Sequence, residues 1–250
     1  MNAYHDAVRR TEEHLMNSWP SLRTVMYDGW VFREAMGYTK RANSAMALHA
    51  RGRFDATLGE AERFYASAGC PTTFRLTPLA GDEPDRVLAD LGYAILDETI
   101  VMTAALAGDP KADKAVTIAP DFTAGWEEGY ADAHALTADA RRAHRAILDR
   151  IAPFSKGFAV AWQDGRPVAF GLGVVERDHL GLFDIVTVPD ARRNGVARKL
   201  VSALMRWGAE KNATTAWLSV IADNERAKPL YTQLGFRELY RYHYRVAGNG

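Results

Sequence analysis

Residues 182–200 read LFDIVTVPDARRNGVARKL, and this stretch decides the fold. It opens with an apolar, β-branched run, residues 182–188, that is typical of a buried strand. Pro189 ends the strand, and a polar loop over 190–194 leads to Gly195. Beyond Val196, apolar side chains at helical spacing predict an amphipathic helix. The stretch therefore predicts a strand, a loop and a helix, with a glycine where the helix begins.

The start of this predicted helix suits an anion. The first N–H groups of a helix lack an intrahelical partner, and the aligned peptide dipoles place partial positive charge there. Gly195 and Ala197 leave room for a phosphate group to approach. Four basic residues lie around them: Arg192, Arg193, Arg198 and Lys199. An ordinary turn between strand and helix, with a solvated basic face, explains the spacing equally well.

Two sequence patterns resemble the signature motifs of one enzyme superfamily. Arg192-x-x-Gly195-x-Ala197 resembles the Q/R-x-x-G-x-G/A signature of the GNAT superfamily of N-acetyltransferases. Further on, residues 224–236 resemble its second signature, N-x-x-A-x-x-x-Y-x-x-x-G-F, through Asn224, Ala227, Tyr231, Gly235 and Phe236. The two signatures stand in the right order and at the right distance.

The resemblance implies acetyl-CoA as co-substrate, with its pyrophosphate on the loop and helix start. Its pantetheine arm would lie along the edge of the strand 184–188, and the Val188 N–H is a candidate oxyanion donor. The side chains of Val186 and Val188 fit an ordinary core. The implied cofactor-binding residues are Ile185, Val186, Val188, Arg192, Arg193, Asn194, Gly195, Val196, Ala197, Arg198, Asn224, Ala227 and Tyr231.

Two residues are catalytic candidates. By resemblance, Tyr231 protonates the departing thiolate, while Asn224 contacts the pantetheine. Asp184 begins the central strand, where a carboxylate facing the cleft could act as the general base. An exposed strand-end carboxylate paired with an arginine is the alternative interpretation of Asp184. Further candidates for contact with the acceptor are Glu127, Glu128 and His134, for which a solvated helix face is an equally good explanation.

Composition narrows the class of protein. The chain has 250 residues, 48% of them apolar, and no formal net charge, so no global field recruits nucleic acid or an acidic membrane surface. A single cysteine, Cys70, is compatible with a reducing cytoplasm. The sequence shows no metal-binding motif, no membrane span and no signal-peptide pattern. These features predict a cytoplasmic protein without a metal centre.

Strand and helix patterns alternate along the rest of the chain and predict a mixed, three-layer α/β/α fold. Strands are expected near 30–33, 42–48, 72–77, 95–105, 116–118, 158–162, 168–176, 216–221 and 238–246. Helices are expected over 2–17, 55–68, 84–91, 124–134, 138–151 and the segment of the second signature. Asp164-Gly165 predicts a hairpin turn. The segment 107–114, AGDPKADK, is the best candidate for a linker.

A repeat divides the chain into two parts. Leu91-Gly92-Tyr93 matches Leu234-Gly235-Phe236, with Gly92 and Gly235 143 positions apart. We therefore expect two tandem GNAT-like units, 1–106 and 115–250, joined by 107–114. At the same offset the first unit has His49, Gly52 and Phe54 for the first signature, and Gly81 and Leu88 for the second. It is interpreted as a degenerate copy in which the Phe54 ring blocks phosphate.

These observations predict an N-acetyltransferase that moves the acetyl group of acetyl-CoA to a primary amine of a small molecule, amino acid or peptide. Transfer of a longer acyl group is one alternative, and a CoA-binding regulatory or scaffold protein without turnover is another. The intact Tyr231 favours an enzyme. Superfamily members often dimerise, so a homodimer is compatible with the resemblance. A segment of the first unit, 28–44, resembles one in actinobacterial tandem GNAT proteins, and the sequence gives it no role.

Overall fold

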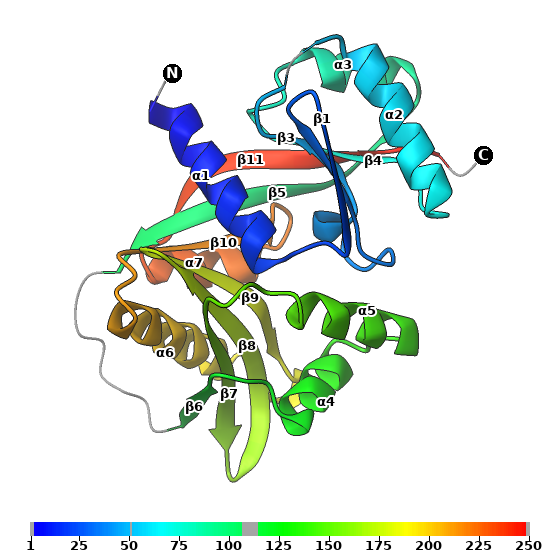
Figure 1. Cartoon of the computed structure of the whole chain (residues 1–250). Helices are drawn as coiled ribbons and strands as arrows, with labels where there is room; N and C mark the ends of the chain where they lie inside the picture. The colour runs from blue at the N-terminus through cyan, green and yellow to red at the C-terminus, as the bar shows by residue number, and fades with distance from the viewer. Residues whose placement is uncertain (1–2, 51, 107–114, 249–250) are drawn as a thin grey trace.

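One mixed β-sheet runs through both halves of the molecule. The structure is a computed structural model and describes residues 3–50, 52–106 and 115–248. Within them the strands lie in the order β1-β2-β3-β4-β11-β5-β10-β9-β8-β7-β6 (Figure 1). The strands are β1 (Arg23–Tyr27), β2 (Trp30–Glu34), β3 (Ala45–Ala47), β4 (Thr73–Leu76), β5 (Ala94–Ala105), β6 (Val116–Ala119), β7 (Ser155–Gln163), β8 (Arg166–Glu176), β9 (His179–Thr187), β10 (Thr215–Ile221) and β11 (Arg237–Val246).

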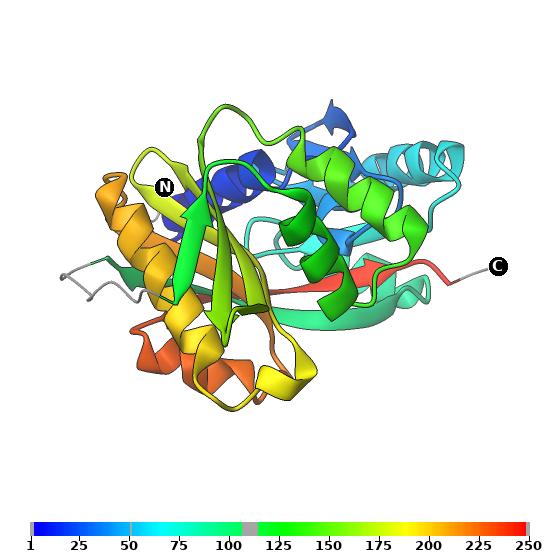
Figure 2. The ribbon, with the colours of Figure 1, turned by 90° about the horizontal axis from the view of Figure 1, so that it is seen from below.

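Helices cover both faces of this sheet (Figures 1 and 2). They are α1 (Ala3–Ser18), α2 (Phe54–Ser67), α3 (Glu83–Asp90), α4 (Ala124–Ala133), α5 (Ala138–Leu148), α6 (Val196–Glu210) and α7 (Ala227–Gln233), with short 3-10 turns η1 (Lys40–Ala42) and η2 (Pro189–Ala191). On β4, Phe74 and Leu76 lie in the core beneath α2 and α3, whereas Arg75 points to α1. The three-layer α/β fold is confirmed.

The two faces carry different helices in the C-terminal half as well. α6 and α7 share one apolar core with β9 and β10. On the opposite side, Trp126 of α4 and Ile147 of α5 share a core with Leu15 of α1. We call the side covered by α1, α4 and α5 the α1 face.

Two strands exchange places between the halves of the chain. β5 lies in the N-terminal half of the sequence, yet it pairs antiparallel with β10 over residues 99–105 and 215–221. β11, the last strand, pairs antiparallel with β4 over residues 243–246 and 73–76. β5 and β11 also pair with each other in the middle of the sheet. The sheet is therefore continuous across the two predicted units, and the linker 107–114 lies outside the described residues.

The exchanged strands are equivalent members of the repeat. α2, β4, α3 and β5 begin 143 residues before α6, β10, α7 and β11, to within one residue at each start. Each half therefore contributes the same kinds of elements in the same order. Because β5 and β11 correspond to each other, the exchange replaces each strand with its counterpart.

A buried ion pair joins α1 to the sheet. The side chains of Glu12 and Arg75 are both completely buried. Arg75 donates through both terminal nitrogens to the carboxylate, with an Nη2 to Oε1 distance of 2.9 Å. From β11, the Tyr240 hydroxyl donates to the same carboxylate, and the ring centre of Tyr242 lies 3.8 Å from the Arg75 guanidinium carbon. This cluster fixes the exchanged strand β11 against the N-terminal half.

Most predicted elements are confirmed, with three differences. The sequence patterns missed β1, an edge strand with mostly exposed side chains that pairs only with β2 among the described strands. The strand predicted over 42–48 is only β3, because the Asn43 side chain bonds to the backbone of the loop before it. The central strand begins at His179, not at residue 182. None of the described helices is long and apolar enough to cross a membrane.

Arg75→Met should lower the free energy of unfolding by about 3–5 kcal/mol, because it leaves the Glu12 carboxylate buried without its partner. Urea denaturation measures the loss. The control is Arg142→Met, which breaks an exposed ion pair with Asp139 and should cost about 0–1 kcal/mol. Equal losses for the two variants would contradict the role assigned to the buried pair.

Candidate functional site

β9 leaves its neighbour β10 part-way along its length. The two strands pair only through residues 179–181 of β9 and 215–217 of β10. A bulge accompanies the divergence, since Asp184 and Ile185 together lie opposite Gly171 of β8, and Asp184 has a φ of 54°. From residue 182 onward, one edge of β9 therefore has no strand partner among the described residues.

The backbone of β9 places its N–H groups differently from the sequence prediction. The Val188 N–H donates to the Val168 carbonyl oxygen of β8 at 3.0 Å, so it is not the free oxyanion donor that we expected. Because N–H groups alternate in direction along a strand, those of Ile185 and Thr187 point to the unpaired edge. Ile185 was among the predicted residues, whereas Thr187 was missed.

The loop after β9 matches the predicted anion site in its shape. Gly195 has a φ of 73° and precedes the first residue of α6, a conformation that glycine adopts without strain. In the described part of the chain, no acceptor bonds the backbone N–H groups of residues 193–198. Arg192 donates through Nε to the Thr187 carbonyl oxygen at 3.1 Å and so ties the loop to the end of β9. Arg193, Asn194 and Arg198 are exposed around it, while Val196 and Ala197 are half-buried.

The equivalent helix start in the N-terminal half differs in its cap and charge. α2 begins with Phe54, whose ring is buried against Trp30 and Phe74. The ring therefore supports the core and does not stand in front of the helix, which corrects our reason for calling this copy degenerate. Arg53, before the helix, is extended, and Asp55 places a carboxylate in the first turn. A negative charge there disfavours a second anion.

Asp184 lies in a buried polar cluster on the α1 face. Its side chain is 7% exposed, its Oδ1 accepts from the Tyr130 hydroxyl at 3.0 Å, and its Oδ2 lies 2.8 Å from His144 Nε2. The expectation of an exposed strand-end carboxylate paired with an arginine is wrong, because Asp184 sits at the bulge inside the strand. Its partners are a tyrosine of α4 and a histidine of α5.

The N-terminal half adds Tyr38 to this cluster. The Tyr38 ring centre lies 5.5 Å from that of His144. Burial and the Asp184 carboxylate raise the pKa of Tyr38 to about 12. Burial also raises the pKa of Tyr130 well above its usual value. Both phenols therefore stay protonated at neutral pH, and the Tyr130 hydroxyl donates to Asp184.

Sequence reasoning missed both hydrogen-bonding partners of Asp184, Tyr130 and His144. The sequence signal that could have indicated them is the helical spacing of these aromatic residues. Tyr130 and His134 lie one helical turn apart on α4, and His144 follows an alanine on the buried side of α5. Nothing local links either helix to Asp184, since 40 residues separate it from His144 and 54 from Tyr130.

Of the further acceptor candidates, His134 alone lies beside this cluster. Its ring centre is 5.0 Å from that of Tyr130, and burial lowers its pKa, so it is neutral at neutral pH. Glu127 pairs with Arg145 at 2.6 Å, and Glu128 is exposed.

The second signature forms α7, directly after β10. Tyr231 is 8% exposed, its ring packs against Phe236, and burial raises its pKa to about 12. The Oδ1 of Asn224 accepts from the Ala227 N–H at 3.1 Å, so these two residues cap the helix together. Pro229 falls in the first turn of α7, as predicted.

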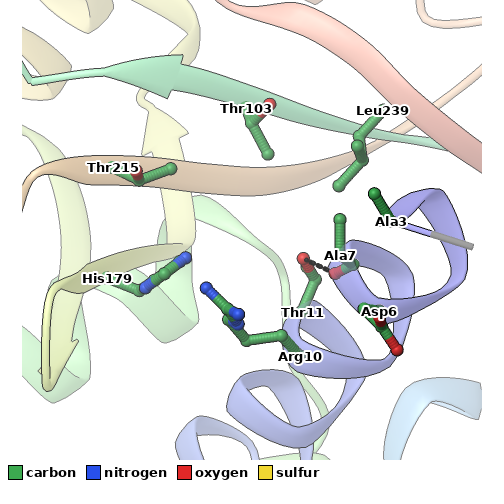
Figure 3. Close-up of a pocket in the computed structure, with 9 residues that line it drawn as sticks. All are labelled: Ala3, Asp6, Ala7, Arg10, Thr11, Thr103, His179, Thr215 and Leu239. Carbon is green, nitrogen blue, oxygen red and sulfur yellow. Dashed lines mark hydrogen bonds between the residues drawn. The ribbon is translucent and has the colours of Figure 1, made fainter. Parts of the chain in front are cut away.

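A cavity of about 450 Å³ lies elsewhere, beneath α1 (Figure 3). Arg10 of α1 and His179, at the start of β9, face each other across it. None of the predicted site residues lines this cavity.

Comparison with known proteins identifies the chain. A family model described as "Probable histone acetyltransferase Rv0428c C-terminal" matches residues 6–245. The chain belongs to this family. It is an acyltransferase of the GNAT superfamily.

Two relatives and one solved structure illustrate the family. The uncharacterised N-acetyltransferase YobR of Bacillus subtilis is 27% identical over 246 residues, which cover 96% of this chain and 99% of YobR. The [ribosomal protein bS18]-alanine N-acetyltransferase of Escherichia coli is 38% identical over 76 residues, 30% of this chain and 51% of that enzyme. A GCN5-related N-acetyltransferase from Kribbella flavida has the same fold, with a TM-score of 0.72, 19% identity and coverage of 97% and 96% of the two chains.

Proposed function

We propose that this chain transfers the acetyl group of acetyl-CoA to a primary amine, at one site where β9 and β10 diverge. The divergence is the observation that carries the proposal. It exposes a strand edge beside the start of α6 on one side and beside Asp184 on the other. Donor and acceptor can therefore meet at the same point of the sheet from different directions.

The donor binds along β9 and at the start of α6. An extended pantetheine arm accepts hydrogen bonds from the N–H groups of Ile185 and Thr187 as an added strand would. The free N–H groups of residues 193–198 and the positive end of α6 hold the pyrophosphate. The Asn224 and Ala227 cap lies at the start of α7. The full set of donor contacts is Ile185, Val186, Val188, Arg192, Arg193, Asn194, Gly195, Val196, Ala197, Arg198, Asn224, Ala227 and Tyr231, with Thr187 added.

Transfer forms a bond between the amine nitrogen and the acetyl carbon and breaks the bond from that carbon to sulfur. The Asp184 carboxylate, held by His144 and Tyr130, accepts the proton that the amine loses. The Ile185 N–H stabilises the oxyanion. Tyr231 donates its phenolic proton to the departing thiolate. Its raised pKa keeps this proton in place throughout the neutral range.

The names of relatives support an amine as acceptor. The Escherichia coli enzyme that matches 76 residues of this chain is named for the alanine of a ribosomal protein. A small amine, an amino acid or a peptide amine therefore fits this chain. The single, half-buried Cys70 suits a cytoplasmic protein.

Acetyl-CoA should bind to one site per chain, and Ala197→Phe should weaken binding at least about 100-fold, because the ring would lie between the helix start and the phosphates. Calorimetric titration measures both. The control is Ala56→Phe, which adds the same ring to the first turn of α2 and should leave affinity unchanged. A second site in the wild type, or loss of binding in the control alone, would contradict the assignment.

Tyr231→Phe should lower kcat by about 10²–10⁴ without changing the affinity for acetyl-CoA, because it removes the thiolate's proton donor. A group with a raised pKa keeps its proton below that pKa and loses it above. With a pKa of about 12, Tyr231 should add no alkaline decline to the rate below about pH 11. The measurement is a pH profile of kcat for both proteins from pH 6 to 10. A decline in the wild type that Tyr231→Phe abolishes would assign Tyr231 a lower pKa and a different role.

A further inference from the structure

A guanidinium with no hydrogen-bonding partner among the described residues stands beside the Asp184 cluster. Arg41, in the η1 turn of the N-terminal half, is half-buried. Its guanidinium carbon lies 5.7 Å from the ring centre of Trp19 and 5.9 Å from that of Phe183, the residue before Asp184. Among the described residues, no carboxylate or carbonyl accepts a hydrogen bond from this side chain. An arginine has five N–H donors, so this position has unused capacity to bind an anion.

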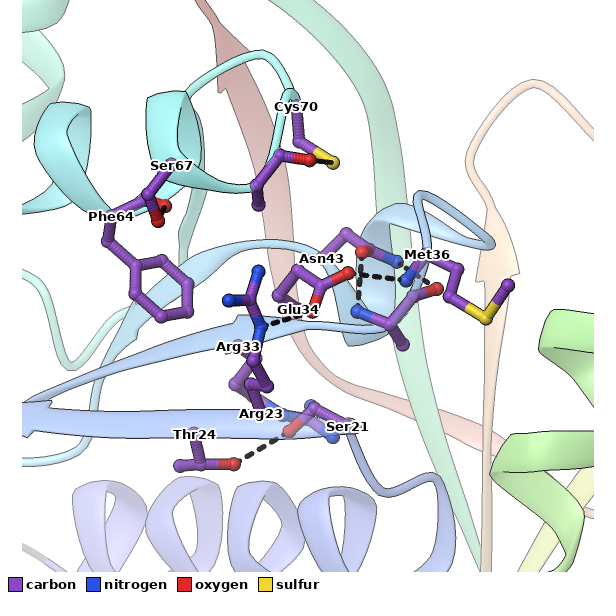
Figure 4. A network of polar contacts seen from close by, with 12 residues as sticks. Ser21, Arg23, Thr24, Arg33, Glu34, Met36, Asn43, Phe64, Ser67 and Cys70 are labelled. Carbon is purple, nitrogen blue, oxygen red and sulfur yellow. Dashed lines mark hydrogen bonds and ion pairs between the residues drawn. The ribbon is translucent and has the colours of Figure 1, made fainter.

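The chain holds this turn rigidly. The Asn43 Oδ1 accepts from the N–H groups of Ala35 and Gly37, and its Nδ2 donates to the Tyr38 and Thr39 carbonyl oxygens. Figure 4 shows Asn43 beside Glu34 and Met36 within a network of polar contacts. Met36 and Thr39 have positive φ, a conformation that persists in non-glycine residues only where surrounding contacts impose it.

Two contacts tie the same turn to the rest of the N-terminal half. The buried Arg33 donates to the Arg41 carbonyl oxygen at 2.9 Å. Trp19, at the end of α1, donates through Nε1 to the Thr39 hydroxyl oxygen at 3.0 Å. The position of Arg41 is therefore set by the fold before any ligand arrives.

The neighbouring residue, Lys40, differs from Arg41 because it has an acidic partner. Lys40 is paired with Asp97 of β5, with 2.7 Å between Nζ and Oδ2. Two adjacent cations in one turn thus have different roles. Lys40 fastens the turn to the exchanged strand, whereas Arg41 lies among aromatic side chains and has no counter-ion in the described part of the chain.

The position of Arg41 separates it from the donor phosphates. Its aromatic neighbours Trp19 and Phe183 belong to the core of the α1 face, together with residues of α4 and α5. The start of α6, where the pyrophosphate binds, belongs to the core on the opposite side of the sheet. The Trp19 ring beside Arg41 also lies 5.8 Å from the ring of His144, the histidine that contacts Asp184, so Arg41 lies on the acceptor side.

We infer that Arg41 binds a carboxylate of the acceptor, so that the amine substrate is an amino acid or another small amine carrying a carboxylate. The inference rests on the proposed function, because it needs the amine to lie at Asp184. A planar guanidinium matches a carboxylate with two parallel hydrogen bonds. The stacked rings of Trp19 and Phe183 lie beside the guanidinium and hold it in place. The N-terminal half thereby contributes a binding residue to the acceptor site.

The test measures acetylation of pairs of acceptors that differ only in the carboxylate, such as lysine against 1,5-diaminopentane and phenylalanine against phenethylamine. The series includes every amino acid that has a decarboxylated counterpart. The full-length wild type should prefer at least one carboxylate-bearing member about 10-fold or more in kcat/KM. Arg41→Met should lower kcat/KM for that acceptor about 10- to 100-fold, mainly through KM, and leave its amine counterpart unaffected.

Lys40→Met is the matched control and should keep the wild-type preference. Arg41→Lys keeps the charge without the fork and should recover only part of the lost activity. Thermal denaturation of each variant checks that the turn remains folded.

The inference is overturned if the wild type prefers the decarboxylated amines, or if Arg41→Met lowers kcat/KM equally for both members of a pair. It is also overturned if the protein binds acetyl-CoA but acetylates no member of any pair. Failure of the proposed function would give a different experimental result. In that case acetyl-CoA itself does not bind, or its binding is unaffected by Ala197→Phe.

Discussion

The exchange of β5 and β11 is the constraint on which the rest of the molecule depends. Each strand completes the sheet of the other half, so the backbone hydrogen bonds of β5 with β10, and of β11 with β4, join the two halves. The Glu12 and Arg75 pair, with Tyr240, reinforces the exchange inside the core. Because the halves share one sheet, α1 and the η1 turn lie at a fixed place over the C-terminal half.

The bulge in β9 lets one strand serve two sides of the sheet. It directs the Asp184 carboxylate to the α1 face, while the Ile185 side chain packs in the core beneath α6. The same divergence leaves the N–H groups of Ile185 and Thr187 at an unpaired edge. A regular strand hydrogen-bonded to β10 throughout would offer no such edge, so the irregularity itself creates the place where an extended donor can lie.

Local patterns in the sequence predicted the parts of the site that depend on local structure. Gly195 at the start of α6 and Pro229 in the first turn of α7 lie where their conformational preferences place them. The repeat of 143 residues predicted the matching order of elements in the two halves. Such features depend on the positions of residues within one segment, and these positions can be taken directly from a single sequence.

Contacts between distant segments could not be predicted in the same way. His144 and Tyr130 reach Asp184 from two other helices, and the exchanged strands pair residues more than a hundred positions apart. The Val188 N–H was assigned wrongly because its direction depends on the register with β8, which the sequence does not specify. Phe54 was misinterpreted because its place in the repeat says nothing about which way its ring points.

The central claim is that one donor site is built from the unpaired edge of β9 and the start of α6. Amide hydrogen exchange with and without acetyl-CoA tests it most directly, since the free N–H groups are themselves the proposed contacts. We predict slower exchange for Ile185, Thr187 and residues 193–198, and no change in the first turn of α2. Protection in the first turn of α2, or unchanged exchange along β9 in the presence of bound donor, would contradict the account.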